Sequence, residues 1–362
     1  MSARPILVMA GGTGGHVYPP LAVAKALSER SQRVVWLGTR RGLEARVIPA
    51  AGIPIEWISV GGLRGKGLAT QLLAPFRLLK ALAQAIAIVN RHRPAMVLGM
   101  GGFASGPGGV AAWLLRRPLV IHEQNAVAGL TNRLLARLAR VVLQAFPGSF
   151  NARVGATTVG NPVREDIAAL PPPEQRYADR SGPLRLLVLG GSLGARSLNV
   201  TLPAALASMA PEDRPTVKHQ TGARTADEAR AAYADSGVEV ELCEYIEDMA
   251  AAYAWADVVV CRAGALTVAE VCAAGLPAIF IPFPHAVDDH QTANAQPLAA
   301  ANAAIIIDES ELTPASLAEQ LTPWLQGRPA LIERANKARS VARPEALKSI
   351  TDTCLSVAGV PA

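Results

Sequence analysis

Short, unbroken apolar runs alternate with longer amphipathic stretches along the whole chain. The first run covers residues 6–10, and a similar run covers residues 186–189. Each is followed at once by glycines and then by helix-forming sequence. Continuous apolar runs are typical of strands buried on both faces of a parallel sheet, and a glycine turn that leads into a helix begins a doubly wound unit. The pattern therefore predicts an α/β fold with two Rossmann-like domains in tandem.

The other apolar runs support this prediction. They indicate further strands at residues 34–38, 96–99, 118–121, 141–143, 217–220, 238–242, 258–260 and 278–281. The first helix is expected at residues 21–27. Strands that alternate with helices are typical of parallel sheets joined by right-handed crossovers.

A proline-rich stretch at residues 160–181 indicates the domain boundary. We expect a first domain at residues 1–162, a second at 163–340, and a C-terminal helix at 341–362 that returns to the first domain. Ligands bind preferentially where two domains meet, so the cleft between the domains is the expected site.

Charge is distributed unevenly. The net charge is +6, but residues 1–160 contain 19 Lys or Arg and 4 Asp or Glu, whereas residues 161–362 contain 16 and 25. The first half should therefore attract anionic partners. Nucleic acid is disfavoured because only 4% of residues are aromatic and no zinc-finger, RNP or helix-turn-helix pattern is present.

An anionic membrane surface fits the charge better. No acidic residue occurs between Glu56 and Glu123, and the segment from Arg64 to Arg93 combines basic side chains with Leu and Phe at helical spacing. Such a segment is typical of peripheral binding to anionic headgroups. The alternative is a core-facing helix with a solvated basic edge.

Other features of the sequence favour a cytoplasmic location. No signal peptide and no uncharged apolar stretch long enough to span a membrane is recognised. None of the four cysteines lies in a CxxC pair, so they are expected to be buried thiols in a reducing compartment.

The first glycine turn, residues 11–15, ends in His16. Its glycines allow close backbone approach and present N–H groups at a helix start. The turn is not a P-loop, because no Gly-Lys-Ser/Thr follows. Arg40 and Arg41 stand where an NAD site needs an acidic residue, so an NADP site remains an alternative. His16 is our first candidate base, and a capping or packing role is the alternative.

Two further segments follow apolar strands in the first half. Residues 99–109 contain six glycines, which suit either a second anion-binding loop or a tight packing loop. Residues 122–125 read His-Glu-Gln-Asn, and dense polarity after a strand predicts ligand hydrogen bonding. Glu123 is the second candidate base. Asn125 is a candidate ligand contact, with helix N-capping as the alternative.

The second half offers groups suited to a nucleoside diphosphate. The turn at residues 190–196 can present N–H groups and a hydroxyl to a pyrophosphate, and Arg164 can neutralise it. Glu270, in the segment 262–270, suits two vicinal ribose hydroxyls, unless it is a solvated helix charge. A polar loop at residues 285–294 can hold sugar hydroxyls. No Asp-x-Asp motif is present, so no metal and no other cofactor is expected.

These motifs together resemble the MurG family, the N-acetylglucosaminyltransferases of peptidoglycan lipid-intermediate synthesis. The resemblance rests on GGTGGH, GMGGFASGPG, HEQN, GNPVR, GGSLGAR, CRAGALTVAE and HQTANA, in this order over nearly the whole chain. It implies a glycosyltransferase fold of the B type, a UDP-GlcNAc donor and lipid I as acceptor. It also implies inversion at the anomeric carbon, with lipid II and UDP as products.

The resemblance also implies roles for individual residues. Thr13, Gly14, Gly15 and Asn125 match donor-sugar and acceptor-side contacts, and Arg164 and Ser192 match diphosphate contacts. Ile246 matches a uracil contact and Gln291 a GlcNAc contact. The nucleoside loop matches Ala265, Leu266, Thr267, Val268, Ala269 and Glu270. The family implies a peripheral location at the cytoplasmic face of the inner membrane, with cell-wall or cell-division proteins as partners.

Several rival functions remain open. A UDP-GlcNAc 2-epimerase or a non-catalytic sugar-nucleotide-binding protein would share the fold, but neither needs a basic apolar segment. An NADP oxidoreductase would need a complete dinucleotide fingerprint. A nucleic-acid binder would not need the acidic second half with its own glycine turn.

Overall fold

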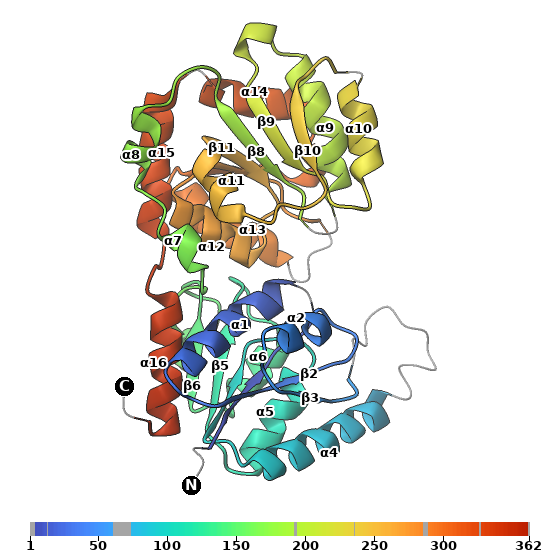
Figure 1. Ribbon diagram of the computed structural model, residues 1–362, viewed down its shortest axis with the longest axis vertical. Helices are drawn as coiled ribbons and strands as arrows, with labels where there is room; N and C mark the ends of the chain where they lie inside the picture. Colours follow the sequence, from blue (N-terminus) through green and yellow to red (C-terminus); the bar gives the residue numbers. More distant parts are fainter. Residues whose placement is uncertain are drawn as a thin grey trace. The chain divides into compact units, whose positions relative to one another are not determined.

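The computed structural model describes residues 4–12, 14–60, 74–191, 194–234, 236–284, 289–325 and 327–360. The chain divides into two compact units. The first comprises Met1–Pro162 together with Pro344–Ala362, and the second comprises Val163–Arg343. Each unit is an α/β domain built on its own parallel sheet (Figure 1), as the sequence predicts.

Seven strands form the sheet of the first unit, in the order β3-β2-β1-β4-β5-β6-β7. The strands are β1 (Ile6–Met9), β2 (Val34–Gly38), β3 (Ile55–Trp57), β4 (Met96–Gly99), β5 (Leu119–Glu123), β6 (Val141–Gln144) and β7 (Thr157–Thr158). The helices are α1 (Gly14–Glu29), α2 (Glu44–Ala50), α4 (Ala74–His92), α5 (Ser105–Leu114), α6 (Leu130–Leu135), the 3-10 helix η1 (Ala152–Val154) and α16 (Ala346–Ala358).

The unbroken apolar run of β1 has a direct structural reason. Ile6 and Val8 point into a core shared with α1, α2 and α16, whereas Leu7 and Met9 point into a core shared with α4, α5 and α6. All four side chains are fully buried. Successive side chains of a strand face opposite sides of the sheet, so a strand covered by helices on both sides needs an apolar residue at every position.

Six strands form the sheet of the second unit, in the order β10-β9-β8-β11-β12-β13. They are β8 (Arg185–Leu189), β9 (Thr216–Gln220), β10 (Val240–Cys243), β11 (Val258–Cys261), β12 (Ala278–Phe280) and β13 (Ala304–Ile306). The helices are α7 (Glu165–Ala168), α8 (Pro173–Ala178), α9 (Arg196–Ala207), η2 (Pro211–Asp213), α10 (Ala226–Ala234), α11 (Met249–Trp255), α12 (Ala265–Ala274), α13 (His290–Ala300), η4 (Glu309–Glu311), α14 (Pro314–Leu325) and α15 (Arg328–Val341).

Two local features differ from the sequence-based expectations. Helix α1 begins at Gly14 and not near Leu21, because its N-terminal part, which includes Pro19 and Pro20, is held by burial in the core. The short strands β3 and β7 lack the apolar runs from which the other strands are predicted, and β13, which lies in the apolar run of residues 303–307, is not predicted either. The four cysteines are free thiols, and no helix of the described residues is long and apolar enough to cross a membrane.

Candidate active site

The strand order reverses between β1 and β4 in the first unit and between β8 and β11 in the second. In doubly wound sheets, ligands bind outside the carboxyl ends of the strands at this reversal. Most of the polar and glycine-rich segments singled out by the sequence follow strands at these two places.

In the first unit, the two glycine-rich loops touch each other. The N–H of Met100 donates to the carbonyl of Met9 at 3.0 Å, which joins the ends of β4 and β1. A Cβ atom on Gly102 would lie 2.2 Å from the carbonyl oxygen of Gly11. Gly101 and Gly102 also have φ values of +90° and +78°, in the left-handed region that favours glycine. Close backbone contact therefore requires glycine at Gly102.

A buried carboxylate lies beside the first glycine turn. Glu44 is fully buried and accepts from the N–H of Gly12 at 3.0 Å, the N–H of Thr39 at 3.0 Å and the hydroxyl of Thr39 at 2.7 Å. The N–H of Gly12 is thus already engaged, and the negative charge of Glu44 would repel a phosphate. This arrangement disfavours the NADP interpretation of the turn.

His16 lies in the first turn of α1 and is half-buried. Its Nδ1 atom is 2.7 Å from Oε1 of Gln124. The amide nitrogen of Gln124 donates to the carbonyl of Met100 at 3.3 Å. Gln124 is only 2% exposed. The sequence pattern does not distinguish Gln124 as a site residue, although the His-Glu-Gln-Asn segment contains it.

The same segment holds Glu123 in a structural network. Glu123 is 3% exposed, and its carboxylate accepts from the backbone and side-chain amides of Asn125, the N–H of Gly129 and the side chain of Asn132, at 2.8–3.2 Å. Both carboxylate oxygens therefore hold the connection that leads into α6. Asn125 does not cap this helix, because the N-cap is Gly129.

His122 and Glu123 lie within β5 and not after it, because they pair with Leu143 and Gln144 of β6. His122 is fully buried, and its Nε2 atom is 2.9 Å from the carbonyl of Gly160. Burial lowers the pKa of His122, so the ring is neutral and donates this hydrogen bond.

In the second unit, the glycine turn follows β8. The N–H of Gly190 donates to the carbonyl of Gln220 at 3.0 Å. Gly194 has a φ of +81°, and a Cβ atom there would lie 2.5 Å from the carbonyl of Thr221. The turn is thus packed closely against the end of β9 before α9 begins. Ser192, like Thr13 in the first turn, lies outside the described residues.

Helix α12 begins directly after β11 and contains Glu270. Gly264 is the N-cap, and it has no side chain that could cap the first turn. Glu270 is half-buried, and Tyr253 donates to its Oε2 atom at 3.0 Å. Burial raises the pKa of Glu270, while the hydrogen bond from Tyr253 and the charge of Arg164 oppose this rise. Glu270 is therefore not a solvated helix charge, and Arg164 is near enough to influence it.

The other expected contacts lie on loops and a helix start of the same unit. Ile246 is half-buried between β10 and α11. Gln291 is the second residue of α13, and its Oε1 atom accepts from the N–H of Phe283 at 3.0 Å. His285 and Asp288 lie outside the described residues.

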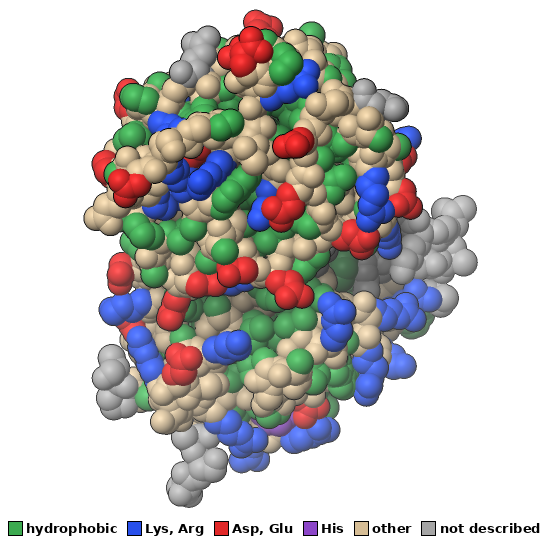
Figure 2. All heavy atoms as spheres, turned by 45° about the horizontal axis from the view of Figure 1, so that its top comes forward, with side chains coloured by type: hydrophobic (Ala, Val, Ile, Leu, Met, Phe, Trp, Pro, Cys, Tyr) green, Lys and Arg blue, Asp and Glu red, His purple; other side chains and the backbone are tan. Residues whose placement is uncertain are grey.

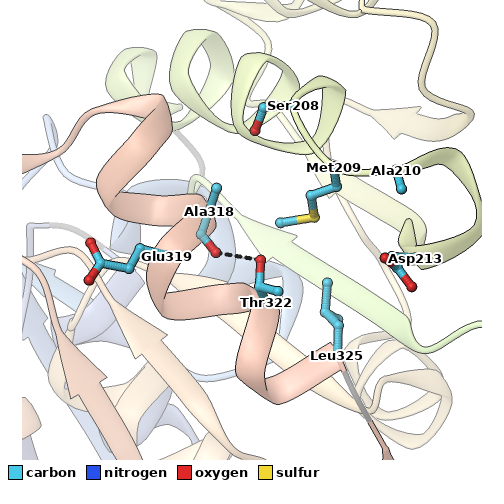
Figure 3. A pocket seen from close by; sticks show the side chains of 8 residues that line it. All are labelled: Ser208, Met209, Ala210, Asp213, Ala318, Glu319, Thr322 and Leu325. Carbon is cyan, nitrogen blue, oxygen red and sulfur yellow. Dashed lines mark hydrogen bonds between the residues drawn. The ribbon is translucent and has the colours of Figure 1, made fainter.

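One surface pocket lies elsewhere on the second unit, between the end of α9 and α14 (Figure 3). It is lined by Ser208, Met209, Ala210, Asp213, Ala318, Glu319, Thr322 and Leu325. Helix α9 starts at the carboxyl edge of the sheet and spans 12 residues, or about 18 Å at 1.5 Å per residue. The pocket at its far end is therefore separate from the glycine turn.

Two doubly wound units in tandem, each with a glycine turn after its first strand, define a glycosyltransferase fold of the B type. Residues 6–144 match the glycosyltransferase family 28 N-terminal domain, and residues 185–350 match the glycosyltransferase family 28 C-terminal domain. The chain belongs to glycosyltransferase family 28.

Similar proteins cover nearly the whole chain. Two are named UDP-N-acetylglucosamine–N-acetylmuramyl-(pentapeptide) pyrophosphoryl-undecaprenol N-acetylglucosamine transferase. The one from Alkalilimnicola ehrlichii is 58% identical over 354 residues, which are 98% of this chain and 99% of that protein. The one from Marinobacter nauticus is 54% identical over 98% of both chains. The crystal structure of Acinetobacter baumannii MurG matches with a TM-score of 0.85 and 42% identity, over 98% of this chain and 99% of that chain.

The contact between the glycine loops gives a stability prediction. Gly102→Ala should destabilise the first unit by at least about 2 kcal/mol, because it adds left-handed backbone strain and a clash with Gly11. Gly129→Ala is the control, since a Cβ there meets nothing within 4 Å and φ is −65°. Thermal unfolding of the purified chains would measure both effects. Equal melting temperatures for the two variants would contradict the steric argument.

Proposed function

We propose that this protein transfers N-acetylglucosamine from UDP-N-acetylglucosamine to lipid I, undecaprenyl-pyrophosphoryl-MurNAc-pentapeptide, giving lipid II and UDP. The observation that carries this proposal is the 51–58% identity, over nearly the full length, to proteins that bear the name of this transferase. The reaction belongs to peptidoglycan synthesis and hence to cell-wall biogenesis, on which cell shape and cell division depend.

The second unit has the groups that a UDP-sugar requires. The positive end of the α12 dipole lies at the start of this helix, which suits a diphosphate. Arg164 adds a positive charge, and Ser192 of the glycine turn adds a candidate hydroxyl. Glu270 can accept hydrogen bonds from the ribose hydroxyls, and Ile246 and Gln291 are the proposed contacts of the uracil and the sugar.

The first unit has the group that an acceptor hydroxyl requires. In the proposed reaction this hydroxyl attacks the anomeric carbon while UDP leaves from the opposite face, so the configuration inverts. A base must take the hydroxyl proton. His16 suits this task because it is half-buried at the carboxyl edge of the sheet. Glu123 suits it less, because four donors already occupy its two oxygens.

The acceptor-dependent release of UDP tests this proposal. Purified protein should release UDP from UDP-N-acetylglucosamine only when a lipid I analogue is present, and EDTA should not prevent it. His16→Ala should lower the rate by about 10²–10⁴-fold, the usual contribution of a general base. His92→Ala is the control. It removes a histidine of α4 that contacts Glu56 of β3, and it should retain most of the activity.

Other results would favour the rival functions. Release of UDP without an acceptor, together with an epimerised sugar, would indicate the 2-epimerase. Tight UDP binding without turnover would indicate a sugar-nucleotide-binding protein. A loss of less than about tenfold in His16→Ala would argue against His16 as the base.

Tyr253 gives a second test, directed at the donor site. Tyr253→Phe removes the hydrogen bond that holds Glu270, and it should raise KM for UDP-N-acetylglucosamine by about 3–10-fold with little change in kcat. Because burial raises the pKa of Glu270, acidification should protonate it and raise KM for the donor further. Tyr233→Phe removes a buried hydroxyl that contacts His219 and should leave KM unchanged. An unchanged KM in Tyr253→Phe would argue against Glu270 as the ribose contact.

The first unit also offers a surface for the membrane. On α4, the residues Ala81, Ala85, Ile88 and Val89 are buried, whereas Phe76, Leu78 and Leu79 are 71%, 51% and 62% exposed. Arg77 and Lys80 alternate with these exposed residues. Lys and Arg side chains also gather on the surface of the first unit in Figure 2. Residues 61–73, which include Arg64 and Lys66, lie outside the described residues.

These features support peripheral binding at the cytoplasmic face of the inner membrane. A role for cell-wall or cell-division proteins as further partners stays a prediction.

Wild-type protein should sediment with vesicles that contain anionic lipid at low salt and dissociate at high salt. Arg77→Glu/Lys80→Glu should lose this binding. The control Lys337→Glu/Lys348→Glu has the same change in charge and should bind normally. Equal binding of wild-type protein to neutral vesicles would contradict the electrostatic contribution.

A further inference from the structure

We propose that Gln124 is a positioning residue that fixes the tautomer of His16. In this tautomer Nδ1 carries the proton and Nε2 carries the lone pair. The inference rests on the proposed function, because it concerns the base of that reaction. It assigns a role to a residue that neither composition nor spacing distinguished.

The orientation of the Gln124 amide follows from its two neighbours. One end faces the carbonyl oxygen of Met100 at 3.3 Å, and the other faces Nδ1 of His16 at 2.7 Å. A carbonyl oxygen can only accept, so the amide nitrogen must face Met100 and the amide oxygen must face His16. The amide oxygen can only accept as well, so Nδ1 of His16 must donate. In a neutral imidazole the lone pair then lies on Nε2.

Neither partner can readily change this arrangement. Gln124 is 2% exposed and Met100 is fully buried. The backbone carbonyl of Gln124 accepts from the side chain of Asn161 at 2.9 Å. On the other side, a Cβ atom on Gly101 would lie 3.0 Å from Nδ1 of His16, so the second glycine loop lies directly against the ring. The amide and the imidazole are therefore held in place from both sides.

This arrangement suits the transfer of one proton. Nε2 takes the proton of the acceptor hydroxyl as its oxygen forms a bond to the anomeric carbon. The bond from that carbon to the diphosphate oxygen breaks, and its electron pair leaves with UDP. Nδ1 donates to Gln124 before and after this step, so the hydrogen bond persists in the imidazolium. The base needs no rearrangement as it becomes charged.

Ring-nitrogen NMR tests the tautomer without any turnover. In ¹⁵N-labelled protein at a pH where the ring is neutral, the signal that disappears in His16→Ala should show a protonated Nδ1 and an unprotonated Nε2. Gln124→Met removes the acceptor with little change in size, so this signal should shift towards a mixture of tautomers. A protonated Nε2 in the wild type, or an unchanged tautomer in Gln124→Met, would overturn the inference.

Kinetics test whether the contact acts through the base. Gln124→Met should lower kcat by about 10–10²-fold, less than removal of the base, and should leave KM for the donor unchanged. In a His16→Ala background it should have no further effect. The control Gln144→Met changes another buried glutamine, which bonds Thr158 and the N–H of Phe150, and should retain kcat.

Two outcomes separate this inference from the proposed function. An equal fall in kcat with and without His16 would show that Gln124 does not act through the imidazole, and it would overturn the inference while transfer itself stands. Absence of acceptor-dependent transfer in the wild type would refute the proposed function, and the inference that rests on it, whatever the NMR result.

Discussion

The first unit depends on the close approach of two backbones at the ends of β1 and β4. Gly102 lies so near Gly11 that no side chain fits between them. This contact brings the second glycine loop against His16, whose position on α1 is set by the first loop. The carbonyl of Met100, which orients Gln124, belongs to the second loop. The geometry around the imidazole is therefore a consequence of backbone packing, which is more rigid than contacts between long side chains.

The two units use similar glycine turns in different ways. In the first unit Glu44 occupies the N–H of Gly12, so part of the turn serves the fold and not an anion. In the second unit the N-cap of α12 is Gly264, which has no side chain, and the positive end of a helix dipole suits a diphosphate. The excess of basic residues in the first half therefore need not be explained by a diphosphate site at the first glycine turn. Exposed basic and apolar residues of α4 give that charge another use.

The longest strands and both glycine turns could be predicted from sequence because they follow local rules. Every position of β1 is buried, so its apolar run was visible without any tertiary information. The start of α1 cannot be predicted in this way, because glycine and proline are weak helix formers. Only the burial of Val17, Pro19 and Pro20 in the structure reveals this part of the helix. Glu123 was predicted as a polar residue at a strand end, but its four donors come from the following loop and α6. Gln124 cannot be predicted as a site residue from sequence, because its partner His16 is 108 residues away and no spacing rule connects the two.

The choice of glutamine beside His16 follows from what lies on either side of it. The site has a ring nitrogen on one side and the carbonyl of Met100 on the other. A carboxylate would accept from the ring but would face the carbonyl oxygen with a negative charge, and no hydrogen bond would be formed there. An amide accepts at one end and donates at the other, so it satisfies both neighbours while buried. Because the amide is neutral, it orients the imidazole without adding a charge that would stabilise the imidazolium.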